Sequence, residues 1–218
     1  DILLQEKMPE NVIITKEEKE KVEKMKYVDD QNYWQKEITK PMTRLPQMNV
    51  LSSNHYQILM DAKGNGYSQF EDILINRYKK TEDLEQGIFF FLKNVKTKRI
   101  WTANCMNYLS QGDKYAMYFM PDQNKIVRQD GSIETVMNVT IAPNEPVELR
   151  TLELTNYGLE EETIEVTSYL EPVLSTMSQD YSHPAFNNLF LSYEYLEEQN
   201  AILVHRRNRN EKEIPIYL

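Results

Sequence analysis

The sequence predicts an all-β protein, an antiparallel β-sandwich preceded by a charged helical linker. From Met48 onward, about ten short apolar runs of strand length are separated by turn residues, a spacing typical of sandwiches. No stretch of helical periodicity interrupts these runs. Residues 1–47 differ in kind, because their middle part is almost wholly charged. A chain of 218 residues has room for one sizeable domain and an appended arm.

The arm, residues 1–47, is predicted to contain a helix. Thr15 followed by Glu18 has the spacing of a capping box, which starts a helix. Residues 16–26 carry mostly charge and leave a narrow apolar stripe that includes Val22 and Met25. A stripe this narrow buries little apolar area. An exposed linker and a helix that docks on a partner therefore both remain open.

Two prolines, Pro41 and Pro46, mark the end of the arm, because proline interrupts regular structure. The sequence thus divides into a linker over residues 1–47 and a β-sandwich domain over residues 48–218. Sandwich domains of this kind often run longer than about 170 residues, so the domain's C-terminal completeness stays open.

The strands of the sandwich are predicted from short apolar or alternating runs bounded by turn residues. They cover residues 56–60, 73–78, 87–93, 98–102, 115–120, 134–141, 147–155, 162–170, 189–195 and 201–204. The run 162–170 has the clearest period of two, with one polar face. In the run 147–155 the apolar phase slips by one residue midway, and we expect a β-bulge there, because a bulge would return both halves to one face.

A glycine turn is the most distinctive local feature. Gly64 and Gly66 flank a single residue, and Tyr67 and Ser68 follow directly. Glycine reaches positive φ without steric cost and lets the backbone pass close to another group. We therefore expect a tight connection between two strands, with Asp72 shortly after it as a further polar residue.

Composition excludes several classes of function. The chain has 25 basic and 34 acidic residues, a net charge of -9, which argues against nucleic acid or an anionic membrane as the partner. A single cysteine, Cys105, excludes an internal disulfide and fits a reducing, cytoplasmic location. No apolar run approaches the length that spans a bilayer. Because the chain begins with Asp, we interpret it as a fragment of a longer protein.

Motifs for catalysis, metals and cofactors are missing from the sequence. His55, His183 and His205 are too scattered for metal-ligand spacing, and no second cysteine supports them. No serine occupies a nucleophile elbow, and the glycine pair at 64 and 66 lacks the rest of a dinucleotide fingerprint. We predict no catalytic residue, no metal and no cofactor for this chain.

Aromatic residues are the remaining feature relevant to sugars, because the faces of pyranose rings stack on flat side chains. A stacking platform is one interpretation, and burial in a sandwich core is the other. The candidate platform residues are Trp34, Tyr67, Phe70, Trp101, Tyr108 and Tyr181.

Several segments, in order, resemble the N-terminal β-sandwich domain of glycoside hydrolase family 94, the sugar phosphorylases formerly placed in glycosyltransferase family 36. The matching stretches are LSSNHY at 51–56, GNGYS at 64–68 with Asp72 and Arg77-Tyr78, GIFFFLKN at 87–94, IWT at 100–102, the strand at 147–156, SYLE at 168–171, HPAF at 183–186 and Arg206-Arg207. Together they span nearly all of residues 48–210. The HPAF segment and the ILLQEK segment at 2–7 are most similar to cyclic β-1,2-glucan synthases and their relatives.

This resemblance implies a galactose-mutarotase-like supersandwich and a division of labour. In the family, the general acid lies in a helical (α/α)6 barrel C-terminal to the sandwich, where phosphate attacks the anomeric carbon with inversion. The sandwich supports that barrel and helps to form a homodimer, and one of its loops approaches the active site. Inorganic phosphate is thus expected only for a full-length parent, which could be anchored in the inner membrane. The residues that the resemblance assigns to substrate contact are Gly64, Gly66, Tyr67, Ser68, Asp72 and Arg77.

Two functions remain open at this point. In the first, the chain is a non-catalytic module of a β-glucan-acting glycosyltransferase or phosphorylase, with structural and interface duties. In the second, it is an autonomous carbohydrate-binding module that holds a β-glucan oligosaccharide. A binding module should expose a row of aromatic rings, whereas a scaffold should bury them.

Overall fold

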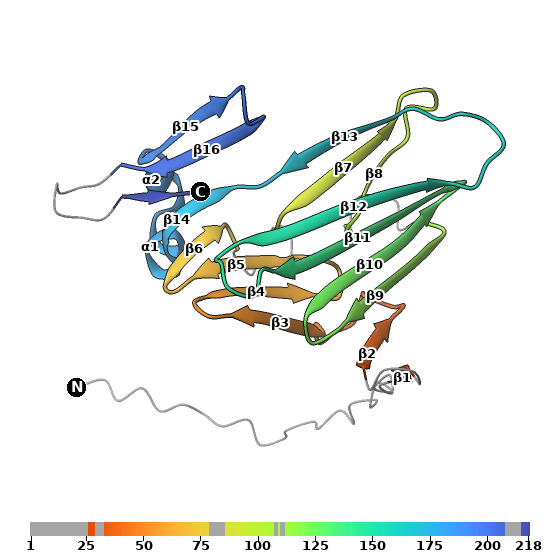
Figure 1. The fold of residues 1–218 in the computed structure, drawn as a ribbon, viewed down its shortest axis with the longest axis horizontal. Coiled ribbons are helices and arrows are strands. Elements are labelled where there is room, and N and C mark those ends of the chain that lie inside the picture. The colour runs from red at the N-terminus through yellow and green to blue at the C-terminus, as the bar shows by residue number, and fades with distance from the viewer. Residues whose placement is uncertain (1–25, 29–32, 79–85, 107–108, 110–111, 208–214) are drawn as a thin grey trace, which may run out of the picture.

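The computed structural model describes residues 26–28, 33–78, 86–106, 109, 112–207 and 215–218, with side chains from residue 35 onward. These residues form 17 strands and two short helices, and all strand pairs are antiparallel (Figure 1). The mostly-β, antiparallel fold class predicted from the sequence is confirmed. The helix predicted after Thr15 falls almost entirely within residues 1–25, outside the described residues.

The largest sheet has six strands in the order β1-β2-β9-β10-β11-β12. Its strands are Lys26–Val28, Tyr33–Ile38, Lys114–Phe119, Gln123–Asp130, Ile133–Ile141 and Glu148–Asn156. Strands β1 and β2 come from the segment predicted as a helical arm, and β2 pairs with β9. The described end of that segment is therefore part of the sheet.

A second sheet has five strands in the order β14-β6-β5-β4-β3. In that order its strands are Pro172–Thr176, Ile73–Asn76, Gly66–Phe70, Tyr56–Asp61 and Met48–Ser53. Two three-stranded sheets complete the fold, in the orders β13-β7-β8 and β15-β16-β17. Their strands are Ile164–Tyr169, Phe89–Asn94 and Ile100–Thr102 in one, and Leu191–Leu196, Ala201–Arg206 and Ile216–Tyr217 in the other.

The two helices, α1 (Met177–Ser182) and α2 (Pro184–Asn188), lie between β14 and β15. Thr176 caps α1 through its side chain, and Pro184 begins α2, where its missing N–H costs nothing. The expectation that no helix interrupts the strands of the sandwich is therefore wrong. The helices are too short for a periodicity signal, since they have six and five residues.

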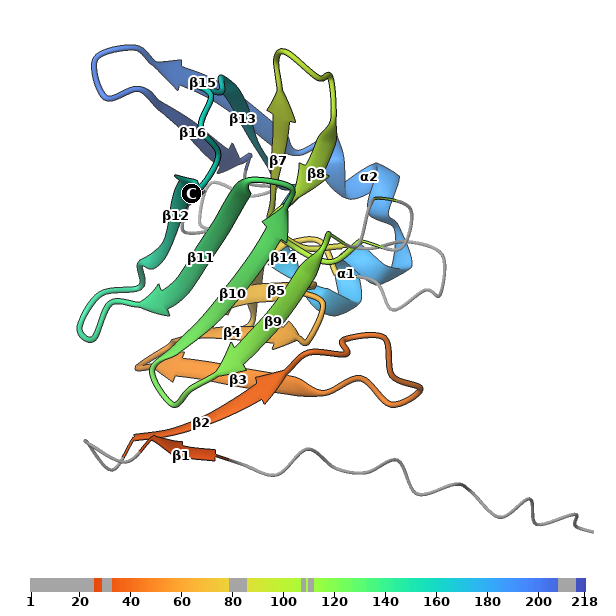
Figure 2. The same ribbon diagram turned by 90° about the vertical axis from the view of Figure 1, so that its right-hand side faces the viewer.

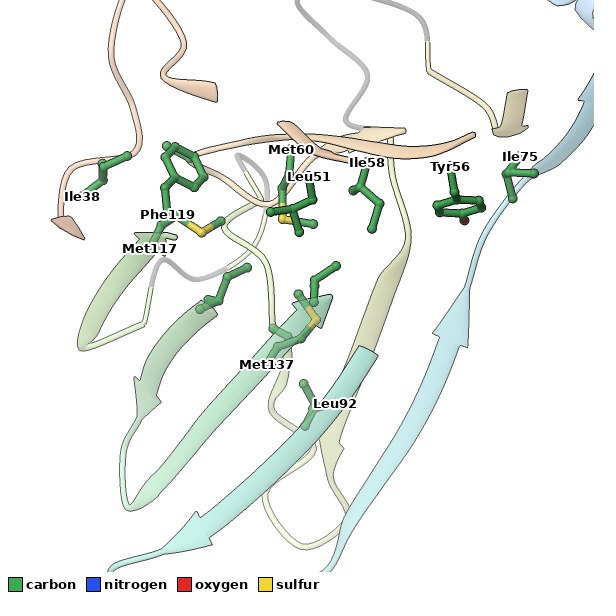
Figure 3. Close-up of a cluster of buried hydrophobic side chains, with 14 of the residues drawn as sticks. Ile38, Leu51, Tyr56, Ile58, Met60, Ile75, Leu92, Met117, Phe119 and Met137 are labelled. Carbon is green, nitrogen blue, oxygen red and sulfur yellow. The ribbon is translucent and has the colours of Figure 1, made fainter. Parts of the chain in front are cut away.

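The core lies between the six-stranded and five-stranded sheets, with the β7–β8 sheet at its side (Figures 1 and 2). Figure 3 shows Leu51, Ile58 and Met60 pointing from β3 and β4 toward Met137 on β11. All four side chains are at most 2% exposed. Buried and more exposed side chains alternate along these strands, so the core lies on one face of each sheet, as in a sandwich.

All ten strands predicted from the sequence are present, with ends that differ by a few residues. The predicted β-bulge in β12 is wrong, because β12 pairs with β11 in one continuous register from Glu148 to Asn156. Glu148 and Arg150 share the inward phase with Leu152, whereas Leu149 is 52% exposed on the other face. A buried charged pair, not a bulge, accounts for the irregular apolar pattern.

Candidate functional site

The glycine turn joins β4 to β5, as predicted. Asp61 organises it, because its Oδ1 accepts hydrogen bonds from the backbone N–H groups of Lys63 and Asn65, both at 2.9 Å. Gly64 has φ +88°, a conformation that favours glycine. A Cβ atom on Gly66 would lie 1.9 Å from a backbone carbonyl oxygen of β4. The hairpin itself therefore requires both glycines.

Neighbouring segments cover this turn. The Cys105 N–H donates to the Lys63 carbonyl at 2.8 Å, and the Asn104 amide donates to the Gly64 carbonyl. Residues 64–66 are all buried, and Asn104 is fully buried. The turn is thus enclosed. Among the residues assigned to it from the sequence, Tyr67 is the one with a partly exposed side chain.

Tyr67 packs against Tyr78, with ring centroids 5.3 Å apart. Both side chains are half-buried. Burial is the main cause that raises the pKa of the Tyr78 phenol, and the nearby Asp61 carboxylate adds to it. Burial also raises the pKa of Asp61, although the N–H groups of Asn65 and Lys63 oppose that shift.

Ser68 points into the protein and is 0% exposed. Its hydroxyl donates to Glu148 Oε2, which also accepts from the Tyr56 hydroxyl at 3.0 Å. The Arg150 guanidinium donates to the other carboxylate oxygen of Glu148. Burial, and next the charge of Glu148, raise the pKa of the Tyr56 phenol well above its usual range. These four residues, the Glu148 cluster, join the five-stranded sheet to β12.

Asp72 lies in the turn between β5 and β6, at the opposite end of β5 from the glycine turn. It is exposed, and its neighbour Glu71 has φ +52° and donates its N–H to the His55 carbonyl at 2.7 Å. A carboxylate at this position faces solvent. It does not converge with Tyr67 or Ser68 on one surface.

Arg77 follows β6 and forms the centre of an ionic network. Its Nε and Nη2 donate to the two carboxylate oxygens of Asp180 at 3.0 and 2.9 Å, and its Nη1 donates to Glu171 at 2.9 Å. The hydrogen bonds to Asp180 are the main cause that raises the pKa of Arg77. The side chains of Arg77 and Asp180 are 12% and 7% exposed. The guanidinium of Arg77 therefore forms its hydrogen bonds within the protein.

The network continues from Asp180 to the C-terminal sheet. The Asn187 amide donates to Asp180 Oδ1 at 3.2 Å and accepts from Arg206 on β16 at 2.5 Å. Arg206 also lies over the ring of Phe190, 5.2 Å from its centroid. The Arg77 network, which we define as Arg77, Asp180, Asn187 and Arg206, therefore holds α1, α2 and β16 on β6 and β14.

The aromatic residues proposed as a sugar platform do not share one surface. Trp101 is 1% exposed, and its indole N–H donates to Thr135 at 3.3 Å. Phe70 is half-buried, whereas Tyr181 on α1 is 65% exposed. The side chains of Trp34 and Tyr108 lie outside those described. A different pair of rings is exposed on β15, where Tyr193 and Tyr195 are 60% and 61% exposed.

Sequence reasoning missed the buried polar residues. Arg128 is 0% exposed on β10 and donates to both carboxylate oxygens of Asp130, at 2.6 and 3.0 Å. It also donates to the Asn104 carbonyl at 2.9 Å. The period of two in Asn124, Ile126, Arg128 and Asp130 was the available signal, but three of these four residues are polar. A strand with a polar inward face gives no apolar alternation.

No group of three or more His, Cys, Asp or Glu side chains in the described part of the chain is arranged to hold a metal ion. His55 lies in the turn after β3, His183 between the two helices and His205 on β16. Neither helix of the described residues has the length and apolar character needed to cross a membrane.

Comparisons with known proteins agree with this architecture. Residues 31–218 match the domain family described as "Glycosyl hydrolase 94, supersandwich domain". The chain is also 31% identical over 214 residues to the cyclic beta-(1,2)-glucan synthase NdvB of Rhizobium meliloti (strain 1021). That match covers 96% of this chain but only 8% of the length of the relative.

Proposed function

Because the chain belongs to the glycosyl hydrolase 94 supersandwich domain family, we propose that it is the non-catalytic β-sandwich domain of a β-glucan-acting glycosyltransferase or phosphorylase. In this proposal, it supports a catalytic (α/α)6 barrel of the same polypeptide and contributes to a dimer interface. Inorganic phosphate would bind only where that barrel is present. The resemblance seen in the sequence is confirmed at the level of the family.

The observation that carries the supporting role is an uncovered apolar surface on the β15–β16 hairpin. Tyr193, Tyr195 and Ile202 share one face of the hairpin, because Tyr195 and Ile202 are register partners and Tyr193 lies two residues away. They are 60%, 61% and 65% exposed. We call these three residues the hairpin face. Leu191 and Val204, at the other end of the same face, are buried in the core.

This apolar face begins in the core and continues onto the exposed part of the hairpin. Such a face is suited to contact with another protein surface. Tyrosine is enriched at such interfaces, because its ring is large and rigid and its hydroxyl tolerates water. Figure 1 shows β15 and β16 projecting beyond the edge of the five-stranded sheet, where a neighbouring domain would reach them. The polar groups of Ser68 and Arg77 are instead used inside the domain, which favours a structural role for them.

The supporting role is tested by mixing the chain with the separately expressed catalytic region of its polypeptide and measuring binding by calorimetry. Ile202→Glu should weaken the association at least about tenfold, because it places a charge on the apolar face. Ala201→Glu is the matched control, since Ala201 is exposed on the opposite face of the same strand. Equal weakening by both variants, or by neither, would overturn this role for the hairpin face.

The non-catalytic part of the proposal has its own test. The chain alone should neither phosphorolyse β-gluco-oligosaccharides nor transfer glucose from glucose 1-phosphate. Release of glucose 1-phosphate that depends on the chain and on phosphate would refute the assignment.

A carbohydrate-binding module is the second candidate, and the exposed tyrosine pair on β15 favours it. Tyr193 and Tyr195 lie on one face two residues apart, so their rings could stack on successive sugar units. Calorimetric titration with linear β-1,2-gluco-oligosaccharides and with cello-oligosaccharides separates the candidates. Saturable heat that Tyr193→Ala abolishes, but that Ile202→Ser leaves unchanged, would favour sugar binding over protein docking. Tyr67→Ala tests the glycine-turn site in the same way.

A further inference from the structure

Strand β12 forms one edge of the six-stranded sheet, and the outer side of its backbone has no partner strand in the described part of the chain. With nine residues it is the longest edge strand of the described sheets, since the others have six residues or fewer. Bulges, prolines and lysines normally protect an edge from pairing with another strand, and β12 has none of them. Its two inward charges, Glu148 and Arg150, are paired with each other at one end, which leaves residues 151–156 without protection.

The hydrogen bonds at the two ends of the β11–β12 pair show which backbone groups of β12 face the free edge. The Ala142 N–H donates to the Val147 carbonyl at 2.8 Å, and the Tyr157 N–H donates to the Ser132 carbonyl at 2.9 Å. Hydrogen-bonded and non-hydrogen-bonded pairs alternate in an antiparallel ladder, so the odd-numbered residues of β12 bond to β11. The even-numbered residues therefore direct their N–H and C=O groups to the free edge.

These outward backbone groups belong to Arg150, Leu152 and Leu154. They form no hydrogen bond with the residues that the structure describes. Three consecutive outward positions provide the donors and acceptors that an additional strand requires. The free edge of β12, as we call these three residues, is therefore a preformed template for strand pairing.

The core is also incomplete along this edge. Leu152 and Leu154 face inward, but both stay half-buried at the margin of the core. At the opposite side of the same sheet, Ile38 on β2 is 0% exposed. Val166 on β13 is similarly uncovered, because it is 46% exposed although its register partner Leu92 is 0% exposed. A strand added beside β12 would cover apolar side chains that the described residues leave in contact with water.

The free edge lies on the same side of the molecule as the hairpin face. Figure 2 shows β12, β13 and the β15–β16 hairpin together along this side, at the left of the view. One partner could therefore contact both the free edge and the hairpin face. The rhizobial relative has ample polypeptide for such a contact, since the match covers only 8% of its length.

We propose that the free edge of β12 accepts an extended segment of the catalytic region of the same polypeptide as an additional β-strand. Main-chain hydrogen bonds to Arg150, Leu152 and Leu154 hold this segment, and its alternate apolar side chains cover the two leucines. The side chains of its other face lie beside Thr151 and Glu153, in water. The identity of the partner rests on the proposed function, whereas the free edge is a property of this chain alone.

Residue-resolved amide hydrogen exchange by NMR tests the strand addition, because it distinguishes the two sides of β12. In the chain alone, the amides of Arg150, Leu152 and Leu154 should exchange at least about tenfold faster than those of Thr151 and Glu153, which donate to β11. Saturation with the separately expressed catalytic region should slow exchange of the first three amides at least about tenfold. Docking through side chains alone would not protect this alternating set.

A pair of variants tests the same contact by calorimetry. Leu152→Lys should weaken binding of the catalytic region at least about tenfold, because it places a charge on the face that the added strand covers. Thr151→Lys is the matched control, since Thr151 is the preceding residue and is exposed on the other face. It should change the affinity less than about twofold. The NMR measurement uses the unmodified chain, so it decides the question even if Leu152→Lys does not fold.

The outcomes separate this inference from the proposed function. Binding of the catalytic region without slower exchange along the free edge would overturn the strand addition and leave the proposed function standing. Absence of binding would contradict the supporting role, and with it the partner proposed for β12. Slower exchange in the chain alone as its concentration rises would assign the free edge to a second copy. Slower exchange along β13 instead of β12 would place the added strand there. Either of these last two results would overturn the proposal.

Discussion

At the residue scale, Gly66 is the glycine with the least room for a side chain. A Cβ atom there would sit 1.9 Å from the Leu59 carbonyl oxygen, a contact that only a backbone shift could relieve. Gly66→Ala should therefore cost at least about 3 kcal/mol of unfolding free energy, measured by urea denaturation. Gly131→Ala is the control. It has φ +65°, but the nearest atom to its Cβ would be 3.8 Å away, so we expect a loss of only about 1 kcal/mol. Equal losses would show that the β4–β5 hairpin relaxes easily.

Buried tyrosines give the domain a stability limit at high pH. Burial, the largest cause in each case, raises the pKa of the Tyr56 and Tyr115 phenols above the ordinary value near 10. When the pH lies between the ordinary pKa and the raised pKa, the unfolded chain has lost the phenol proton that the folded chain keeps. The free energy of unfolding is therefore highest below pH 10 and falls as the pH rises above it. Each tyrosine contributes a slope of about 1.4 kcal/mol per pH unit.

Urea unfolding between pH 8 and pH 11 measures this slope. Tyr115→Phe removes one of the titrating groups along with its hydrogen bond to the Ala62 carbonyl. The variant should be less stable at pH 8 but should lose stability less steeply above pH 10. A slope that Tyr115→Phe leaves unchanged would contradict this assignment.

At the element scale, α1 and α2 are too short to be stable alone and depend on the Arg77 network. Arg77→Met leaves the Asp180 carboxylate buried without its partner, which should cost about 3–5 kcal/mol. Hydrogen exchange should accelerate in α1, α2 and β16 before it does in β10 and β11. Lys93→Met is the control, because the Lys93–Glu165 pair is exposed and should contribute less than about 1 kcal/mol. Equal losses of unfolding free energy in the two variants would show that the Arg77 network does not stabilise these helices.

Strands with an apolar alternation could be predicted from the sequence, whereas inward polar residues hid β10 and made the pattern of β12 irregular. The strands around Ile58, Leu92 and Met137 follow a period of two because their inward residues are apolar. In β10 and β12, Arg128, Glu148 and Arg150 occupy inward positions, and their partners lie far away in the sequence or on the same strand. A buried ion pair is stable only in its three-dimensional setting, so a sequence pattern does not reveal it. For this reason β10 was missed and a bulge was wrongly expected in β12.

The same limit applies to the candidate site. The glycine turn could be predicted, because the backbone geometry of Gly64 and Gly66 is a local property. The burial of Ser68 and the occupation of Arg77 depend on β12 and α1, which lie 80 and 103 residues away. Contact between a glucan and the six residues assigned from the family resemblance stays a prediction.

At the scale of the whole molecule, burial is uneven from one end of the fold to the other. Strands β10 and β11 alternate regularly between buried and half-buried residues. On β15 and β16, by contrast, only Leu191 and Val204 are buried. The domain therefore has one well-packed centre and a C-terminal sheet attached to it through few core residues. An arrangement of this kind suits a module that completes its packing against another surface.

This unevenness predicts two levels of local stability within one domain. Amide groups of β10 and β11 should exchange only through global unfolding, whereas those at the distal end of the hairpin, around Tyr195 and Ile202, should exchange through local opening. Met137→Ala should distinguish these two kinds of exchange, because it creates a cavity in the core between the sheets. We expect it to lower the free energy of unfolding by about 2–5 kcal/mol. Mass-spectrometric hydrogen exchange should then show faster exchange in β10 and β11, with little change at the distal hairpin. Parallel acceleration of both regions would mean that the hairpin opens only with the core, and the hairpin face would then be a rigid extension of the sandwich rather than a separately mobile contact.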